Sequence, residues 1–136
     1  MRAVAAGVGQ AWGVSEHVVP PGWPAEVRPP GAPDWERTAT GWLLDLCPPD
    51  YRRYEVLTRH PVVLARFAVR HVEAGVEAAR LGLANARHEL ADVASAETVA
   101  AAVSAYEREG ARLTATTRAV RLVEEALRGR RFVRRL

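Results

Sequence analysis

Hydrophobic residues in the second half of the chain follow a pattern that reads the same from both ends. Along residues 62–90 and again along residues 99–127, mostly apolar positions recur at steps of three and four, which is the seam spacing of a packed helix. The two series mirror each other about the bond between Ala94 and Ser95. We therefore predict an all-α fold built on a long antiparallel helical hairpin, over about residues 61–91 and 96–129. The predicted layers are Val62–Leu127, Ala65–Glu124, Val69–Val120, Val72–Thr117, Val76–Leu113, Ala79–Gly110, Leu83–Tyr106, Ala86–Val103 and Leu90–Val99.

Local signals mark where these helices begin and which charges flank them. Pro61 suits the first turn of a helix, and Ser95 is a good N-cap for the second helix. In the mirrored register Arg80 is expected to reach Glu107. By the same reasoning Glu73 is expected to reach Arg121. Exposed pairs of this kind favour one register more than they add stability.

Two short helices are predicted before the hairpin. One covers about residues 35–47, with Asp34 as its N-cap, and the other starts at Asp50 and runs through Thr58. Trp35 and Trp42 lie on one face of the first short helix, and we expect that face to pack on the hairpin. The expected docking groove consists of small residues on the first long helix: Ala68, Gly75, Ala78 and Gly82.

The N-terminal segment has a different composition. Six of the nine prolines lie between residues 20 and 33, and proline prevents both helix and central strand there. We therefore divide the chain into an extended or disordered Pro/Trp-rich arm, residues 1–33, and a helical hairpin domain, residues 34–136, with a basic C-terminal end. Trp12 and Trp23 are the candidate partner-binding residues of the arm. The alternative is that both tryptophans pack against the chain's own hairpin.

Charge is unevenly distributed along the chain. Residues 1–50 hold 3 Arg and 6 acidic residues, whereas residues 51–136 hold 16 Arg and 10 acidic residues. The hairpin register gathers arginines at its open end, near the Tyr51-Arg52-Arg53-Tyr54 segment, and interleaved arginine and aromatic residues suit nucleic acid. However, the chain has 19 Arg and no Lys, which we interpret mainly as the codon bias of a GC-rich genome, so the positive charge is weaker evidence for nucleic-acid binding. The predicted basic patch consists of Arg59, Arg66, Arg70, Arg118, Arg121, Arg128, Arg130, Arg131, Arg134 and Arg135.

No constellation of residues points to catalysis, a cofactor or a metal. Glu73 and Glu77 share a helix face, but neither has the histidine that a helical metal motif requires three residues later. Glu124 occupies a seam position where a buried carboxylate is costly, and we expect it to meet Arg66 or water. The lone Cys47 has no evident activating group, and a single cysteine fits a reducing cytoplasm. No apolar run is long enough to span a membrane.

The sequence therefore predicts a cytoplasmic, non-catalytic helical interaction or scaffold module that binds a protein partner or itself. It gives no indication of a small-molecule substrate or a membrane. The alternative is a nucleic-acid-binding accessory protein that uses the arginine-rich open end.

Overall fold

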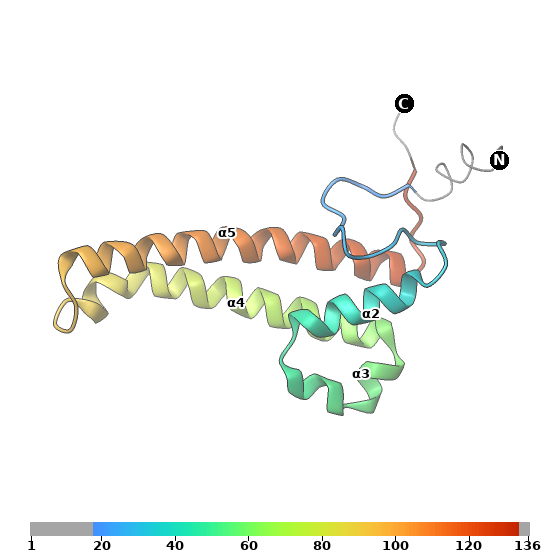
Figure 1. Ribbon diagram of the computed structural model, residues 1–136, viewed down its shortest axis with the longest axis horizontal. Coiled ribbons are helices and arrows are strands. Elements are labelled where there is room, and N and C mark those ends of the chain that lie inside the picture. The colour runs from blue at the N-terminus through green and yellow to red at the C-terminus, as the bar shows by residue number, and fades with distance from the viewer. Residues whose placement is uncertain (1–17, 134–136) are drawn as a thin grey trace.

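Two long antiparallel helices, α4 (Pro61–Leu90) and α5 (Ala96–Leu127), form the hairpin in the computed structural model, which describes residues 18–133 (Figure 1). Shorter helical segments precede them: α2 (Trp35–Leu46), the 3-10 helix η1 (Pro49–Arg53) and α3 (Glu55–Arg59). All regular structure in residues 18–133 is helical. The predicted all-α hairpin with short N-terminal helices is therefore confirmed, and the limits of α2, α4 and α5 agree to within two residues. The helix expected from Asp50 through Thr58 is instead divided into η1 and α3, because the backbone is extended at Tyr54.

The helix boundaries have the local causes that the sequence suggested, with one exception. Ser95 caps α5, because its Oγ accepts a hydrogen bond from the Thr98 backbone N–H at 3.1 Å. His60 is extended (φ −127°, ψ 91°) and Pro61 opens α4, as expected for a residue that precedes proline. Asp34 precedes α2 but makes no capping hydrogen bond. It lies in the left-handed region (φ 63°), and its carboxylate accepts a hydrogen bond from Arg37 at 3.1 Å.

Contacts across the hairpin confirm the mirrored register. A Cβ placed on Gly110 would lie 3.9 Å from the Ala79 Cβ, so these two residues face each other as predicted. The predicted ion pair between Glu73 and Arg121 is also present. The predicted pair between Arg80 and Glu107 is wrong, because Arg80 instead bonds Glu77 one turn earlier on its own helix. That hydrogen bond holds the pKa of the Glu77 carboxyl below its usual value.

The glycines of α4 pack against side chains of α5. The expectation that α2 packs on these glycines is therefore wrong. A Cβ on Gly75 would lie 3.0 Å from a methyl group of Leu113, and one on Gly82 would overlap the ring of Tyr106. Both large side chains come from the facing helix, and glycine makes room for them. A side chain at position 82 would therefore have less space than one at position 110, where the nearest atom is the Ala79 Cβ at 3.9 Å.

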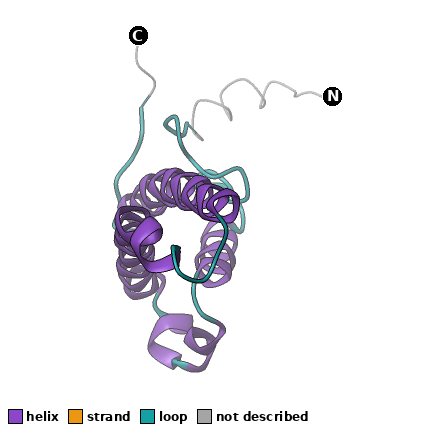
Figure 2. Cartoon of the chain, turned by 90° about the vertical axis from the view of Figure 1, so that its left-hand side faces the viewer, coloured by secondary structure: helices purple, strands orange, loops and turns teal. Residues whose placement is uncertain are grey.

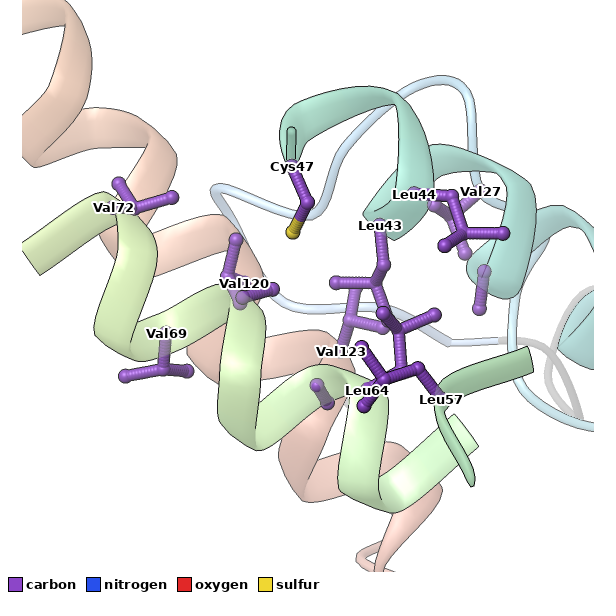
Figure 3. Close-up of a cluster of buried hydrophobic side chains, with 13 residues drawn as sticks. Val27, Leu43, Leu44, Cys47, Leu57, Leu64, Val69, Val72, Val120 and Val123 are labelled. Atoms are coloured by element: carbon purple, nitrogen blue, oxygen red, sulfur yellow. The ribbon is translucent and has the colours of Figure 1, made fainter. Parts of the chain in front are cut away.

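The core lies at the open end of the hairpin, where α2 and α3 pack against α4 (Figure 3). Leu43 of α2, Leu57 of α3 and Leu64 of α4 are fully buried together with Val123 of α5. The N-terminal elements thus cover the open end of the seam. Trp35 and Trp42 are partly buried at the margin of the core rather than within it. The buried residues of this core are Val27, Ala39, Leu43, Leu44, Cys47, Leu57, Leu64, Ala65, Ala68, Val69, Val72, Val120 and Val123.

The described part of the proline-rich arm, residues 18–33, has no helix but packs on the hairpin domain. Its path is a series of turns, with backbone hydrogen bonds from Trp23 N to Pro20 O, Val27 N to Pro24 O and Ala32 N to Pro29 O. Val27 is only 3% exposed and belongs to the core. The predicted boundary at residue 33 therefore does not separate a free arm from a core in this part of the chain.

The other half of the hairpin projects away from this core. From there α4 and α5 extend together to the turn at residues 91–95, away from α2 and α3 (Figure 1). Seen from that turn, the η1–α3 segment lies to one side of the hairpin (Figure 2). The N-terminal elements thus concentrate aromatic and charged side chains at the open end.

Candidate interaction surface at the open end of the hairpin

Four ring side chains form an aromatic surface where η1 meets α4. We define this aromatic surface as Tyr51, Tyr54, Phe67 and His71. Tyr51 lies at its centre, with ring centroids 6.1 Å from Tyr54, 5.9 Å from Phe67 and 6.2 Å from His71. The contacts with Phe67 and His71 are edge-to-face, which is a favourable arrangement for aromatic rings. Tyr51 thereby connects the 3-10 helix to the outer face of α4.

The aromatic surface is open to solvent on both sides of Tyr51. Tyr54 is 51% exposed and Phe67 is 43% exposed, and the nearby Val56 of α3 is 50% exposed. Clustered large apolar side chains at such exposure are unusual in a protein without a binding partner, whereas scattered ones are normal. The surface therefore has the composition of a docking site.

Phe67 was missed by the sequence reasoning, although the two tyrosines were noted. On α4 the seam passes through Ala65 and Val69, and Phe67 lies between them on the opposite side of the helix. A large aromatic residue outside the seam of an amphipathic helix was the available signal. What the sequence could not show is that η1 folds back to bring Tyr51 against it.

Most arginines of the predicted basic patch already contact a carboxylate. The ion pairs are Arg59–Glu55 (3.2 Å), Arg66–Glu124 (2.7 Å), Arg70–Glu73 (3.4 Å), Arg121–Glu73, Arg128–Glu124 (3.3 Å) and Arg130–Glu125 (2.7 Å). Arg66 of α4 and Arg128 of α5 share Glu124, and Arg70 and Arg121 share Glu73. Four glutamates accompany them, so the patch is less positive than its arginines alone suggest.

Two patch arginines have no carboxylate partner within residues 18–133. Arg118 lines a shallow cavity of about 270 Å³ between α4 and α5, which also contains Arg121 and its partner Glu73. Arg131 lies beside Arg130 and Phe132 after the end of α5, and the Arg130 guanidinium stacks 5.3 Å from the Phe132 ring centroid. Arg134 and Arg135 lie outside the described residues.

Glu124 is the buried charge of this end, with only 7% of its surface exposed. Arg66 Nη2 donates to its Oε1 at 2.9 Å, and Arg66 Nε lies 2.7 Å from Oε2 without pointing well enough to form a hydrogen bond. Arg128 adds a hydrogen bond to Oε2 at 3.3 Å. The expectation that Glu124 meets Arg66 is thus confirmed. Because the guanidinium groups of Arg66 and Arg128 compensate its charge, Glu124 has a structural role in the core.

Trp23 is engaged by its own chain. Its indole N–H donates to the Val27 carbonyl at 2.8 Å, and its ring packs edge-on against Phe132 at 5.8 Å. Of the two alternatives for this residue, the structure shows packing against the chain itself. Trp12, the other candidate anchor of the arm, lies outside the described residues.

Cys47 is buried in the core between α2 and η1, and burial raises the pKa of its thiol from 9.0 to about 11. The thiol is therefore protonated at neutral pH and is a poor nucleophile. In residues 18–133, no three His, Cys, Asp or Glu side chains gather closely enough to hold a metal ion. No helix in that range combines the length and apolarity needed to cross a membrane.

No family model, curated protein or solved structure matches this chain.

Proposed function

We propose that this protein is a non-catalytic helical interaction module that binds a protein partner, or a second copy of itself, through the aromatic surface. The observation that supports this most directly is the exposure of Tyr54 and Phe67 around Tyr51. Tyrosine, phenylalanine and arginine are enriched at the centres of protein interfaces, where lysine is depleted. Because Cys47 fits a reducing compartment, we also propose a cytoplasmic location.

The site has an architecture suited to docking. The Tyr51 ring contacts both Tyr54 and Phe67. Because these contacts already restrict the two exposed rings, little side-chain freedom would be lost when a partner binds. Arg53 directly precedes Tyr54, and Arg70 follows Phe67 by three residues on α4, so these two exposed arginines provide charge beside the rings. An interface with an apolar centre and a polar rim is the usual arrangement in protein complexes.

Site-specific photo-cross-linking tests this proposal. A photoreactive phenylalanine analogue at position 67 should give a discrete protein adduct in the native cytosol. The same analogue at Leu81, which lies on α4 and is 49% exposed, serves as the matched control. Tyr54→Ser should suppress the adduct formed at position 67. Identical adducts from positions 67 and 81, or none from position 67, would contradict the proposal.

Nucleic acid binding at the basic patch is the second candidate function. It is favoured by Arg118 and Arg131, which have no carboxylate partner in the described part of the chain. If these arginines contact phosphates, binding of a labelled oligonucleotide should weaken as salt increases, and each Arg→Gln variant should reduce the salt slope by about one. Arg108→Gln, at an exposed position on α5, is the control. An unchanged salt slope in both patch variants would exclude phosphate contacts by these residues.

A further inference from the structure

A hollow on the outer side of α2 is opposite in charge to the aromatic surface. It has a volume of about 450 Å³, and we call it the α2 hollow. Its lining residues are Glu26, Thr38, Gly41, Trp42, Asp45 and Leu46. The lining is thus acidic, with an indole and a leucine side chain as its apolar part.

The charges of the two surfaces are complementary. Most charges of both surfaces are compensated within the chain, because Arg59, Arg66 and Arg70 pair with glutamates and Arg52 pairs with Asp45 of the α2 hollow. The charges that remain are opposite in sign. Glu26 in the α2 hollow and Arg53 beside the aromatic surface each lack an ion-pair partner among residues 18–133. Complementary charge of this kind directs two surfaces toward each other and fixes their register.

Gly41 leaves the backbone of α2 uncovered at the α2 hollow. It lies within α2, it is exposed, and a Cβ built on it would meet nothing within 4 Å. Glycine weakens the interior of a helix, and the chain's own packing gives no reason for it here. A helix surface without a side chain lets a partner approach its backbone.

The two surfaces are neighbours on the same chain. Arg52 Nη2, from the segment between Tyr51 and Tyr54, donates to Asp45 Oδ1 of the α2 hollow at 2.7 Å. This ion pair marks the border between the two surfaces. A two-fold axis near that border would place each surface of one copy against the other surface of the second copy, so a closed dimer would use both contacts twice.

We propose that the partner of the aromatic surface is a second copy of this chain, whose α2 hollow receives it. Phe67 or Tyr54 of one copy enters the hollow beside Trp42 and above Gly41 of the other copy. Arg53 of the first copy pairs with Glu26 of the second. This assignment rests on the proposed function and names the partner that the same surface binds.

The oligomeric state of the full chain tests the assignment, and Gly41 gives the most direct variant. The wild type should approach twice 14.9 kDa in light scattering as concentration rises. Gly41→Gln should remain at 14.9 kDa over the same range, because the new side chain occupies the hollow. Its helical circular dichroism should be undiminished, since position 41 has open space around it. A Gly41→Gln variant that dimerises like the wild type would overturn the assignment.

Reversing the charge at either end of the proposed Arg53–Glu26 ion pair gives a second test. A misfolded variant could lose the dimer, but it could not regain it when mixed with the complementary variant. Arg53→Glu and Glu26→Arg should each raise the dimer dissociation constant by about tenfold or more, because like charges then face each other. Mixing the two variants should restore a dimer, since both contacts of the mixed dimer are again between opposite charges. Glu107→Arg, at an exposed position far along α5, should leave dimerisation unchanged. Failure of the mixture to associate would overturn the assignment.

The outcomes separate this inference from the proposed function. A protein that stays monomeric at every concentration, but still forms an adduct with a different protein through position 67, refutes the second copy and supports the interaction module. If Arg53→Glu instead abolishes oligonucleotide binding by a monomer, the surface binds nucleic acid and the inference is wrong.

Discussion

Single residues at the open end show how one charge fits into a mostly apolar core. Glu124 is buried at a seam position where an apolar side chain would pack well, and it is tolerated because Arg66 and Arg128 compensate it. Arg66 remains partly in water, with 43% of its side chain exposed. Removing one member of such a pair costs more than the pair contributes, because the remaining charge loses its compensation.

Arg66→Ala is therefore expected to lower the free energy of unfolding by about 1–3 kcal/mol, since the buried Glu124 carboxylate loses its main partner. Urea denaturation at neutral pH measures the change. The double variant Arg66→Ala/Glu124→Leu should recover most of the loss, because an apolar residue needs no partner. Arg87→Ala, at an exposed position on the same helix, is the control. An equal loss from both arginines would show that the pair is unimportant.

At the scale of elements, the distance between α4 and α5 depends on small residues that face large ones. Gly82 accommodates the ring of Tyr106, and Gly75 accommodates Leu113. These contacts determine how the hairpin is built along its projecting half, where α2 and α3 do not reach. In that half the two long helices bury residues mainly against each other, as at Ala79, Ala86, Val99 and Val103.

Gly82→Ala is expected to destabilise the protein by about 1–3 kcal/mol, because the new methyl group overlaps the Tyr106 ring and the ring must move. Thermal melting followed by circular dichroism measures the effect. Gly110→Ala is the matched control, since its Cβ would make an ordinary 3.9 Å contact with Ala79. That control should be neutral or slightly stabilising, as alanine favours a helix.

A second comparison identifies the source of the Gly82 effect. In a Tyr106→Ala background the ring is absent, so Gly82→Ala should no longer destabilise and should raise stability by at most about 1 kcal/mol. If Gly82→Ala costs the same with and without Tyr106, the close approach of α4 and α5 is not limited by this ring.

At the scale of the whole molecule, stability is concentrated where four segments meet. α2, α3, the base of the hairpin and residues 24–32 share one core, whereas the projecting half of the hairpin has none beyond its seam. A two-helix hairpin alone would be marginally stable. The N-terminal segments are therefore structural parts of the molecule, and they also build the aromatic surface.

Val27→Ala tests whether the proline-rich segment belongs to the core. Its side chain is 3% exposed, so the substitution should cost about 1–3 kcal/mol of unfolding free energy in urea denaturation. Val133→Ala, at a position that is 82% exposed, should change stability by no more than about 0.5 kcal/mol. If the Val27 variant is as stable as the Val133 variant, the side chain of Val27 contributes little to the free energy of unfolding, and the proline-rich segment is not part of the core.

The sequence by itself determined the two long helices, their limits and the register of the hairpin. These features depend on local signals and on a periodic seam, and both are visible in the sequence. Ser95 caps α5 and Pro61 begins α4. The mirrored apolar positions pair across the seam. The same register correctly placed Glu73 near Arg121 and Glu124 near Arg66. It could not decide the partner of Arg80, because an exposed arginine chooses between nearby carboxylates of almost equal energy.

Only the tertiary structure decided what covers the open end. The sequence did not show that Val27 would be buried, because a proline-rich segment lacks the periodic pattern that reveals a buried face. It also did not show that Tyr51 would bring Tyr54, Phe67 and His71 together, since that contact joins residues from separate elements. Local propensity and periodicity specify elements, whereas the surface between elements depends on how they pack. For this protein, the candidate interaction surface lies at such a junction.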